Sequence, residues 1–303
     1  MVIPFWKNCN NKCVMCTNPA GIAPDKTGYF SFVLLKKYID SKKKHKSAVD
    51  IIYLTGGEPT IRPDFFDSVA YISKSFPLVR VCVMSNGRRF FYPDFTKKCL
   101  SFPNIEFIIP IHGWDAKSHD AVSGVPGSFA QTIGGLKNIL AFRHPSQQIE
   151  IRVIIHRINY KKLNKIFDFI QKKMPSVERV VAIFAEYEGQ AIKNYKSISL
   201  SHKKFYPEFR RLRKYLNKFK EIRFYHFPLC TIPKEFWPYT WRTLEKDEIC
   251  FPKKCVGCSV KKICLGVHKN YSKLFGDKEL EPIKETVPLK LSNNYDHPIE
   301  DVE

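Results

Sequence analysis

The chain has 303 residues, of which 44% are hydrophobic and 14% aromatic, a composition typical of folded globular proteins and not of disordered ones. The net charge of +21 favours an acidic partner, although lysine runs on helix faces are more often only solvated surface. No apolar run approaches the roughly 18 residues of a membrane span, and the N-terminus lacks the features of a signal peptide. We therefore expect a cytoplasmic protein without a membrane partner.

Strand-like and helix-like runs alternate along the first two thirds of the chain. Runs of strand length and composition occupy residues 2–6, 50–54, 78–84, 104–111, 149–155 and 177–184. Amphipathic runs with helical periodicity occupy residues 29–44, 63–75, 94–100, 127–142, 160–173 and 201–219. Six such alternations predict an α/β fold with a parallel sheet and helices packed outside. Because six units are too few for a closed eight-stranded barrel, we expect a partial (β/α)6 barrel.

The composition changes after about residue 220, where core residues become sparse and cysteines frequent. A segment with so little periodicity would need a metal to fold. We predict a barrel over residues 1–220, a small cysteine-rich iron–sulfur extension over 221–276, and a polar C-terminal tail over 277–303.

Polar motifs follow the predicted strands one after another. A cysteine run follows the first strand, Gly56-Gly57-Glu58-Pro59 the second, Ser85-Asn86 the third, and residues 112–115 the fourth. Active sites of parallel barrels lie on the loops after the C-terminal ends of the strands. We therefore expect these loops to meet at one site.

Three cysteines lie close together in the first loop: Cys9, Cys13 and Cys16, with the spacing C-x3-C-x2-C. Three thiolates on one short loop can hold three irons of a four-iron cluster and leave the fourth iron open to chemistry. A zinc site would usually complete four ligands with a second C-x2-C or a histidine pair, which this loop does not offer.

Five further cysteines lie in the extension: Cys230, Cys250, Cys255, Cys258 and Cys264. A disulfide framework would require a small secreted domain, so the clustering favours metal. Cys230, Cys255, Cys258 and Cys264 can close a second four-iron cluster, with Cys250 an alternative ligand or a free thiol. If neither Cys230 nor Cys250 binds, the cluster would keep an open iron that could bind substrate directly. A structural zinc site with four cysteine ligands is the alternative.

The cysteine loop and the Gly-Gly-Glu-Pro motif together resemble the radical S-adenosylmethionine (SAM) superfamily over about residues 1–200. The resemblance implies that SAM chelates the open iron of a [4Fe-4S] cluster and is cleaved reductively to a 5′-deoxyadenosyl radical. It implies that the two glycines let the backbone approach the methionine moiety and that Glu58 accepts a hydrogen bond from its ammonium group. The residues expected at SAM are Gly56, Gly57, Glu58, Pro59, Ser85, Asn86, Arg152 and Glu186.

The C-terminal cysteines are similar to the twitch or SPASM extension of some radical SAM enzymes, which implies a second, auxiliary [4Fe-4S] cluster. Five cysteines favour the shorter twitch type with one cluster. Several short segments further resemble the maturases of His-Xaa-Ser peptide systems: residues 120–129, 132–138, 151–154, 186–191 and 228–233. Because the first strand begins at residue 2, we expect no separate peptide-recognition domain before the barrel.

These resemblances imply a radical enzyme that abstracts hydrogen from a peptide or protein, with cross-linking, thioether formation or epimerisation as outcomes. An electron donor such as flavodoxin or ferredoxin would then be a partner. Modification of RNA or of a small anionic metabolite is the alternative, which the basic composition favours. A non-catalytic zinc-binding protein is a further, different class.

Overall fold

The computed structural model describes residues 1–18, 31–44 and 49–285. Residues 29 and 30 of the first predicted helix and most of the predicted C-terminal tail lie outside this range. Two compact units divide the chain: Met1–Arg152 with Ser176–Glu178, and Val153–Pro175 with the chain from Arg179 onward. Each unit is described by itself.

A sheet whose strand order follows the chain order forms the centre of the fold. The pairings from β1 to β5 and from β6 to β8 are parallel. Its strands are β1 (Val2–Trp6), β2 (Ile51–Gly56), β3 (Arg80–Met84), β4 (Ile105–Pro110), β5 (Ile149–Ile155), β6 (Arg179–Phe184), β7 (Glu221–Tyr225) and β8 (Thr240–Trp241). The predicted parallel α/β architecture is confirmed, with two strands more than predicted.

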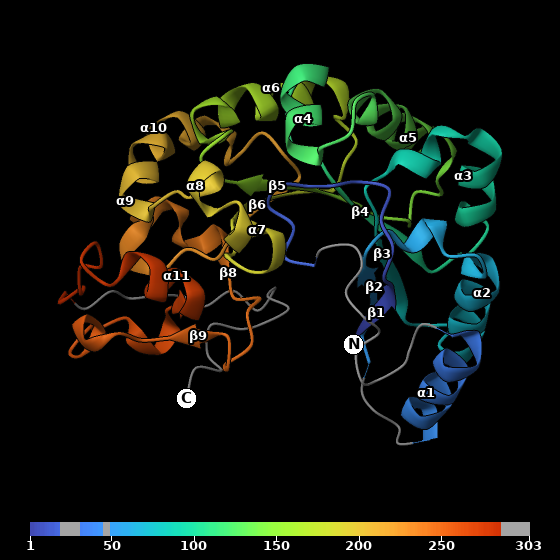
Figure 1. Cartoon of the computed structure of the whole chain (residues 1–303), viewed down its shortest axis with the longest axis horizontal. Helices are drawn as coiled ribbons and strands as arrows, with labels where there is room; N and C mark the ends of the chain where they lie inside the picture. Colours follow the sequence, from blue (N-terminus) through green and yellow to red (C-terminus); the bar gives the residue numbers. More distant parts are fainter. Residues whose placement is uncertain (19–30, 45–48, 286–303) are drawn as a thin grey trace. The chain divides into compact units, whose positions relative to one another are not determined.

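Helices alternate with the strands. In the first unit, α1, α2, α3 and α5 lie together along one side of β1–β4 (Figure 1). The α-helices are α1 (Phe32–Lys44), α2 (Phe65–Ser75), α3 (Pro93–Leu100), α4 (Ala116–Ser123), α5 (Ser128–Phe142), α6 (Leu163–Lys173), α7 (Gly189–Lys193), α8 (Tyr195–Ile198), α9 (His202–Phe205), α10 (Phe209–Leu212) and α11 (Lys269–Phe275). The 3-10 helices are η1 (Pro59–Ile61), η2 (Arg88–Phe91), η3 (Tyr160–Lys162), η4 (Tyr206–Glu208), η5 (Arg213–Tyr215), η6 (Leu229–Thr231), η7 (Lys234–Tyr239), η8 (Lys253–Cys255) and η9 (Lys261–Ile263).

The strand β7 lies in the segment that the sequence assigned to the cysteine-rich extension. The sequence did not predict β7 as a strand, because it contains charged residues and a buried strand is expected to be apolar. Arg223 is buried, hydrogen-bonds to Glu221 on the same strand, and places its guanidinium 3.3 Å from the ring centre of Trp241. These interactions compensate the buried charge, so the sheet continues past the predicted boundary at residue 220.

Helical turns run from His202 to Tyr215, but they are not the single α-helix predicted over residues 201–219. They alternate between α and 3-10 geometry as α9, η4, α10 and η5. Pro207 lies in η4 and has no N–H for the regular ladder, which accounts for the break.

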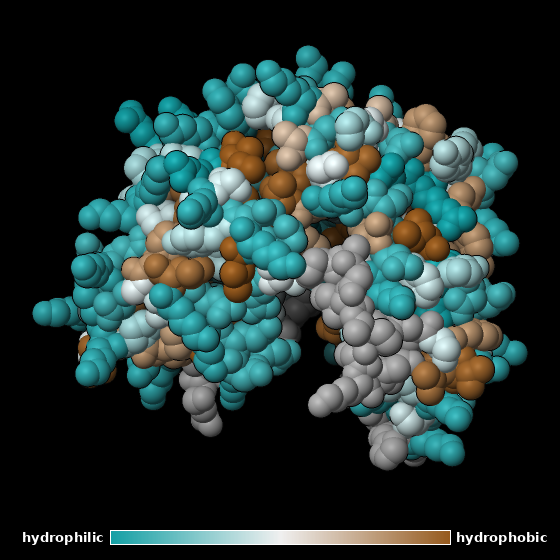
Figure 2. All heavy atoms as spheres, viewed as in Figure 1, coloured by the Kyte–Doolittle hydropathy of each residue, from teal (hydrophilic) through white to brown (hydrophobic). Residues whose placement is uncertain are grey.

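The C-terminal part of the second unit contains a small antiparallel pair, β9 (Ile249–Cys250) with β10 (Val267–His268). Helix α11 contacts β9 and lies beside it in Figure 1. Hydrophilic residues predominate on the face drawn in Figure 2, in agreement with the charge of the chain. Among the described residues, no helix has both the length and the hydropathy needed to cross a membrane.

A buried arginine in the segment that follows β2 hydrogen-bonds to the end of β1. Arg62 is 1% exposed, donates two hydrogen bonds of 2.7 Å to the Asp64 carboxylate, and donates a third to the Phe5 carbonyl at 2.8 Å. Its guanidinium also lies 4.6 Å from the Phe5 ring centre. The chain leaving β1 therefore has a set direction where the cysteine loop begins.

Replacing Asp64 with alanine would leave the buried guanidinium without this carboxylate. We expect the free energy of unfolding to fall by about 3–5 kcal/mol. The matched control is Asp67→Ala, which removes an exposed carboxylate from the first turn of α2 and should cost at most about 1 kcal/mol. Urea unfolding of the three proteins measures both losses, and equal losses would contradict the role given to Asp64.

Candidate metal centre and active site

The three N-terminal cysteines lie together on the loop after β1. The backbone N–H of Cys16 donates to the Cys13 carbonyl at 3.2 Å, which closes a turn between them. The Cys9 sulfur accepts a hydrogen bond from the backbone N–H of Asn11 at 3.3 Å, and the Cys16 thiol donates to the Asn18 carbonyl at 3.0 Å. The loop thus holds its three sulfurs in a compact arrangement.

Two glycines after β2 pack directly against the backbone of this loop. Gly57 N–H donates to the Trp6 carbonyl at 2.6 Å, and Glu58 N–H donates to the Asn8 carbonyl at 2.7 Å. A Cβ on Gly56 would lie 2.4 Å from the Trp6 carbonyl oxygen, and one on Gly57 would lie 2.2 Å from that of Asn8. Gly56 also has φ +117°, a conformation that favours glycine. The cysteine loop itself therefore requires both glycines, whatever their part at SAM.

The carboxylate of Glu58 joins the loops after β2 and β3. Its Oε1 accepts hydrogen bonds from Thr60 N–H at 3.1 Å, Thr60 Oγ1 at 2.5 Å and Ser85 Oγ at 2.7 Å. Its Oε2 accepts one from Asn86 N–H at 2.6 Å. A carboxylate oxygen can accept more than one hydrogen bond, so Oε2, which has a single donor among these four, keeps capacity for another. Burial raises the pKa of this carboxyl, and the four donors oppose that rise.

Asn86 and Arg88, in the loop after β3, form hydrogen bonds with the cysteine loop. The Asn86 Nδ2 group donates to the Asn10 side chain at 2.6 Å, and Arg88 Nη1 donates to the Asn11 side chain at 2.9 Å and to the Asn10 carbonyl. A hydrogen bond of 2.7 Å to Gln131 on α5 orients the guanidinium. Sequence reasoning missed Arg88, since one arginine in a strongly basic chain gives no signal.

The other side of the cysteine loop is held by the end of α4. Lys12 N–H donates to the Ser123 carbonyl at 2.8 Å, and Val14 N–H donates to the Val122 carbonyl at 2.9 Å. Asp120 of the same helix accepts hydrogen bonds at 2.7 Å from Gly127 N–H, from Phe129 N–H and from the Ser128 hydroxyl. The Asp120–Phe129 segment thus docks the loop at one end and caps α5 at the other.

The other two residues expected at SAM make the following contacts. Arg152 is on β5 itself, and its Nε donates to Glu150 of the same strand at 2.5 Å. Glu186 follows β6 in the second unit, where its carboxylate lies 3.3 Å from Nδ1 of His226. The remaining six residues expected at SAM lie on the two loops that hydrogen bonds join to the cysteine loop and to each other: Gly56, Gly57, Glu58, Pro59, Ser85 and Asn86.

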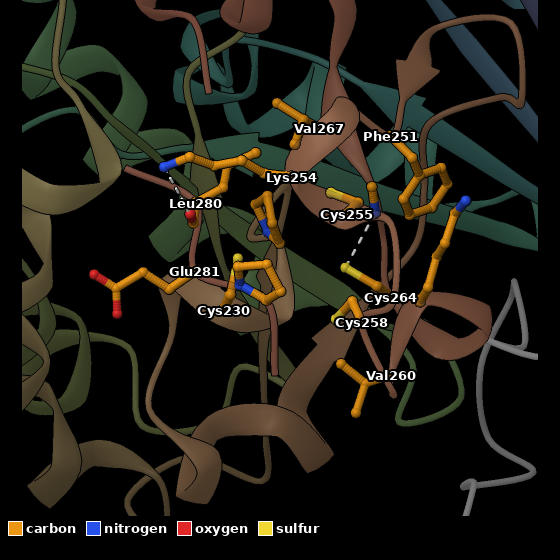
Figure 3. A pocket seen from close by; sticks show the side chains of 14 residues that line it. Cys230, Phe251, Lys254, Cys255, Cys258, Val260, Cys264, Val267, Leu280 and Glu281 are labelled. Atoms are coloured by element: carbon orange, nitrogen blue, oxygen red, sulfur yellow. Dashed lines mark hydrogen bonds between the residues drawn. The ribbon is translucent and has the colours of Figure 1, made fainter. Parts of the chain in front are cut away.

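Four of the five C-terminal cysteines line one pocket in the second unit. Figure 3 shows the side chains of Cys230, Cys255, Cys258 and Cys264 around it. Cys250 is not among the residues that line this pocket; it is part of β9, opposite Val267. Four of the five predicted ligands therefore surround one pocket, and Cys250 lies on the neighbouring strand β9.

Residues 277–285 pack along this pocket, although the sequence assigned them to a polar tail. Leu280, Glu281 and Pro282 are part of the lining, and Leu280 is 2% exposed. Ser259 N–H donates to the Ile283 carbonyl at 2.8 Å, and the Lys254 ammonium donates to the Lys278 carbonyl at 2.9 Å. The described start of the tail is thus part of the pocket wall.

Both cysteine groups offer the thiolates that iron–sulfur clusters use. Within residues 1–18, 31–44 and 49–285, no group of three or more His, Cys, Asp or Glu is arranged to hold a single metal ion. A zinc ion needs four sulfurs about 2.3 Å from one point, whereas each thiolate of a cluster binds its own iron. Backbone N–H groups of Leu229 and Gly266 lie 3.4 and 3.5 Å from the Cys264 sulfur, where they would stabilise a thiolate.

The thiols are protonated in the metal-free protein. Burial raises the pKa of Cys9 to about 11 and the pKa of Cys13 to about 12. Bound metal reverses this preference, because its charge deprotonates a coordinating thiol. Cluster assembly at this loop would therefore release protons.

Comparison with known proteins identifies the family of the chain. The model of the radical SAM superfamily matches residues 3–170, more than half of the chain. The chain belongs to the radical SAM superfamily and is an enzyme of that class, whose members use a [4Fe-4S] cluster and SAM. The resemblance found in the cysteine loop and the Gly-Gly-Glu-Pro motif is thereby confirmed.

Two characterised proteins are similar in sequence to about half of this chain. The AdoMet-dependent heme synthase of Nitratidesulfovibrio vulgaris is 30% identical over 166 residues, 55% of this chain and 43% of that protein. The mycofactocin maturase MftC of Mycobacterium tuberculosis is 30% identical over 157 residues, 52% of this chain and 38% of that protein. The matched region spans less than half of either relative.

Two solved structures that contain peptides have a similar fold. Streptococcus suis SuiB bound to precursor peptide SuiA superposes with a TM-score of 0.54 at 14% identity, over 72% of this chain and 45% of that one. The enzyme anSMEcpe with bound AdoMet and Cp18Cys peptide also gives 0.54, at 18% identity, over 73% of this chain and 62% of that one. At these identities the likeness concerns the fold alone.

Gly57→Ala should displace the cysteine loop, since its Cβ would lie 2.2 Å from the Asn8 carbonyl oxygen. Such overpacking costs about 1–3 kcal/mol, so we expect less iron bound at this loop and loss of SAM cleavage. The control is Gly127→Ala, where φ is +80° but no atom lies within 4 Å of the new Cβ. Iron analysis and 5′-deoxyadenosine formation measure the effect, and normal values for Gly57→Ala would refute this packing argument.

Proposed function

We propose that this radical SAM enzyme abstracts hydrogen from a peptide or protein substrate, in the manner of the peptide maturases. The pocket of four cysteines is the observation that carries the proposal, because it fits an auxiliary [4Fe-4S] cluster. The fold shared with SuiB and anSMEcpe, whose structures contain peptides, supports it, as does the relationship to mycofactocin maturase. The finer likeness to His-Xaa-Ser maturases points to the same substrate class.

The residues of the first site have separate tasks in this proposal. Cys9, Cys13 and Cys16 would hold three irons and leave one for SAM, which supplies the 5′-deoxyadenosyl radical on reduction. The free capacity of Glu58 Oε2 suits the ammonium group of SAM, while Ser85 and Arg88 position the carboxylate and the cysteine loop around it. The packed glycines keep this arrangement rigid, which favours reaction at one substrate position.

The auxiliary site would be fully ligated by protein. Cys230, Cys255, Cys258 and Cys264 all line the pocket, so a four-iron cluster held there has a thiolate for every iron. We therefore assign it to electron transfer and not to direct binding of substrate. After removal of a hydrogen atom the substrate would carry one unpaired electron; an auxiliary cluster held by these cysteines would supply an acceptor for that electron, and loss of a proton would complete a two-electron oxidation of the substrate.

A small anionic molecule is the second candidate substrate. The relationship to AdoMet-dependent heme synthase and the net charge of +21 favour an anionic tetrapyrrole, whose carboxylates would meet lysine and arginine. This candidate shares the radical chemistry and differs only in what is oxidised.

Substrate-dependent SAM cleavage distinguishes the two candidates. The anaerobically reconstituted protein is incubated with SAM, dithionite and either candidate precursor peptides or a propionate-bearing tetrapyrrole, with the Cys9/Cys13/Cys16 triple alanine variant as control. We expect peptides to raise 5′-deoxyadenosine formation at least about tenfold, equivalent to a barrier lowered by 1.4 kcal/mol, and deuterium to pass from labelled peptide into 5′-deoxyadenosine. Stimulation and deuterium transfer by the tetrapyrrole alone would contradict the peptide proposal.

Cysteine variants test the auxiliary cluster independently of the substrate. The Cys255→Ala/Cys258→Ala double variant leaves only two of the four pocket thiolates, so the iron content should fall from about eight per chain toward about four. Cys250→Ala is the matched control, since Cys250 lies outside the pocket and should leave iron and sulfide unchanged. About four irons in the unaltered protein would show that no second cluster is present, and iron loss only in Cys250→Ala would contradict the ligand set.

A further inference from the structure

We propose that His112 donates a hydrogen bond from Nε2–H to the Cys13 thiolate and thereby raises the reduction potential of the SAM-binding cluster. This role rests on the cluster that membership of the superfamily provides. It depends neither on the auxiliary cluster nor on the peptide substrate proposed above.

The imidazole approaches the cysteine loop from a different part of the first unit. His112 follows β4 (Ile105–Pro110), is 99 residues from Cys13 in sequence, and is only 2% exposed. Its Nε2 lies 4.0 Å from the Cys13 sulfur. This is at the long end for a hydrogen bond to sulfur, an atom larger than oxygen, and a thiolate attracts an N–H donor more strongly than a thiol does.

Neighbouring groups hold the imidazole in this position. The His112 backbone N–H donates to Nδ1 of His119 on α4 at 3.3 Å, and the two rings are 5.1 Å apart. Gly113 packs against α4, and a Cβ at this position would lie 2.2 Å from Ser118 Oγ. The backbone on both sides of the His112 side chain is therefore fixed against the helix that also docks the cysteine loop.

A donor at this sulfur would affect the redox chemistry in one direction. The reduced cluster carries one more negative charge than the oxidised cluster, so an N–H directed at a ligand sulfur stabilises the reduced form more. Low solvent exposure strengthens the interaction. Cys9 already accepts a local backbone N–H from Asn11 at 3.3 Å, whereas the imidazole supplies a donor to Cys13 from a distant segment. SAM cleavage requires reduction of the cluster, which makes the potential functionally relevant.

Three variants separate the hydrogen bond from the packing of the ring. His112→Phe keeps an aromatic ring but removes the donor, His112→Gln keeps an N–H donor, and His144→Phe makes the same change at an exposed position of the first unit. Anaerobic potentiometric titration followed by EPR, using the signal that changes on adding SAM, gives the midpoint potential of each. We expect a more negative potential in His112→Phe, a value nearer wild type in His112→Gln, and no change in His144→Phe.

An unchanged potential in His112→Phe, or equal shifts in His112→Phe and His112→Gln, would overturn the proposal. If His112→Phe does not retain the cluster, the unaltered protein decides the question. With ¹⁵N-labelled imidazole groups, electron–nuclear double resonance of the reduced SAM-sensitive signal should show a coupled ring ¹⁵N and its exchangeable proton, and the ring ¹⁵N coupling should be lost in His112→Gln. Absence of that coupling in the unaltered protein would refute the role of His112.

Discussion

The backbone contact between the cysteine loop and Gly56-Gly57 is the constraint on which the first site depends. Hydrogen bonds of 2.6 and 2.7 Å tie residues 57 and 58 to the chain leaving β1, at a distance that leaves no room for a Cβ. Glu58 then extends the same connection to the loop after β3 through Ser85 and Asn86. The segment that carries the cysteines and the segments suited to SAM are thus positioned together, which is the preorganisation that radical chemistry at one substrate atom needs.

The second pocket is assembled differently. Cys230 and Cys255 lie in short 3-10 turns, Cys258 and Cys264 lie outside any helix or strand, and Leu280, Glu281 and Pro282 complete the wall. A segment with few strands and long loops has less apolar burial to offset the entropy of ordering it, so a bound cluster would contribute much of its stability. The first site, in contrast, is held by the packed strands and helices of a complete α/β unit.

Strands and helices with a regular pattern of hydrophobic residues could be predicted from the sequence. Elements with charged or small polar residues at buried positions could not, because contacts with distant residues stabilise them. The bounds predicted for β1 and β5 agree with the structure residue for residue, because β1 is a continuous apolar run and apolar and charged residues alternate at the start of β5. Strand β7 was missed because Glu221 and Arg223 are charged; hydrogen bonds to Glu221 and Tyr225 and the Trp241 ring compensate the burial of Arg223. The short helix α4 was missed because its eight residues bury mainly small or polar side chains.

The sequence by itself determined the chemistry, since cysteine spacing and a Gly-Gly-Glu-Pro motif are local properties that require no knowledge of distant contacts. It also determined the fold class, because strand-like and helix-like runs alternate along the chain and few architectures accommodate that order. Only the tertiary structure decided which residues meet. It brought Arg88 and His112 to the cysteine loop, paired Arg152 with Glu150 and Glu186 with His226, and placed four of the five C-terminal cysteines around one pocket. Most of these contacts join residues far apart in the chain, and their geometry follows from how whole elements pack and not from any local pattern.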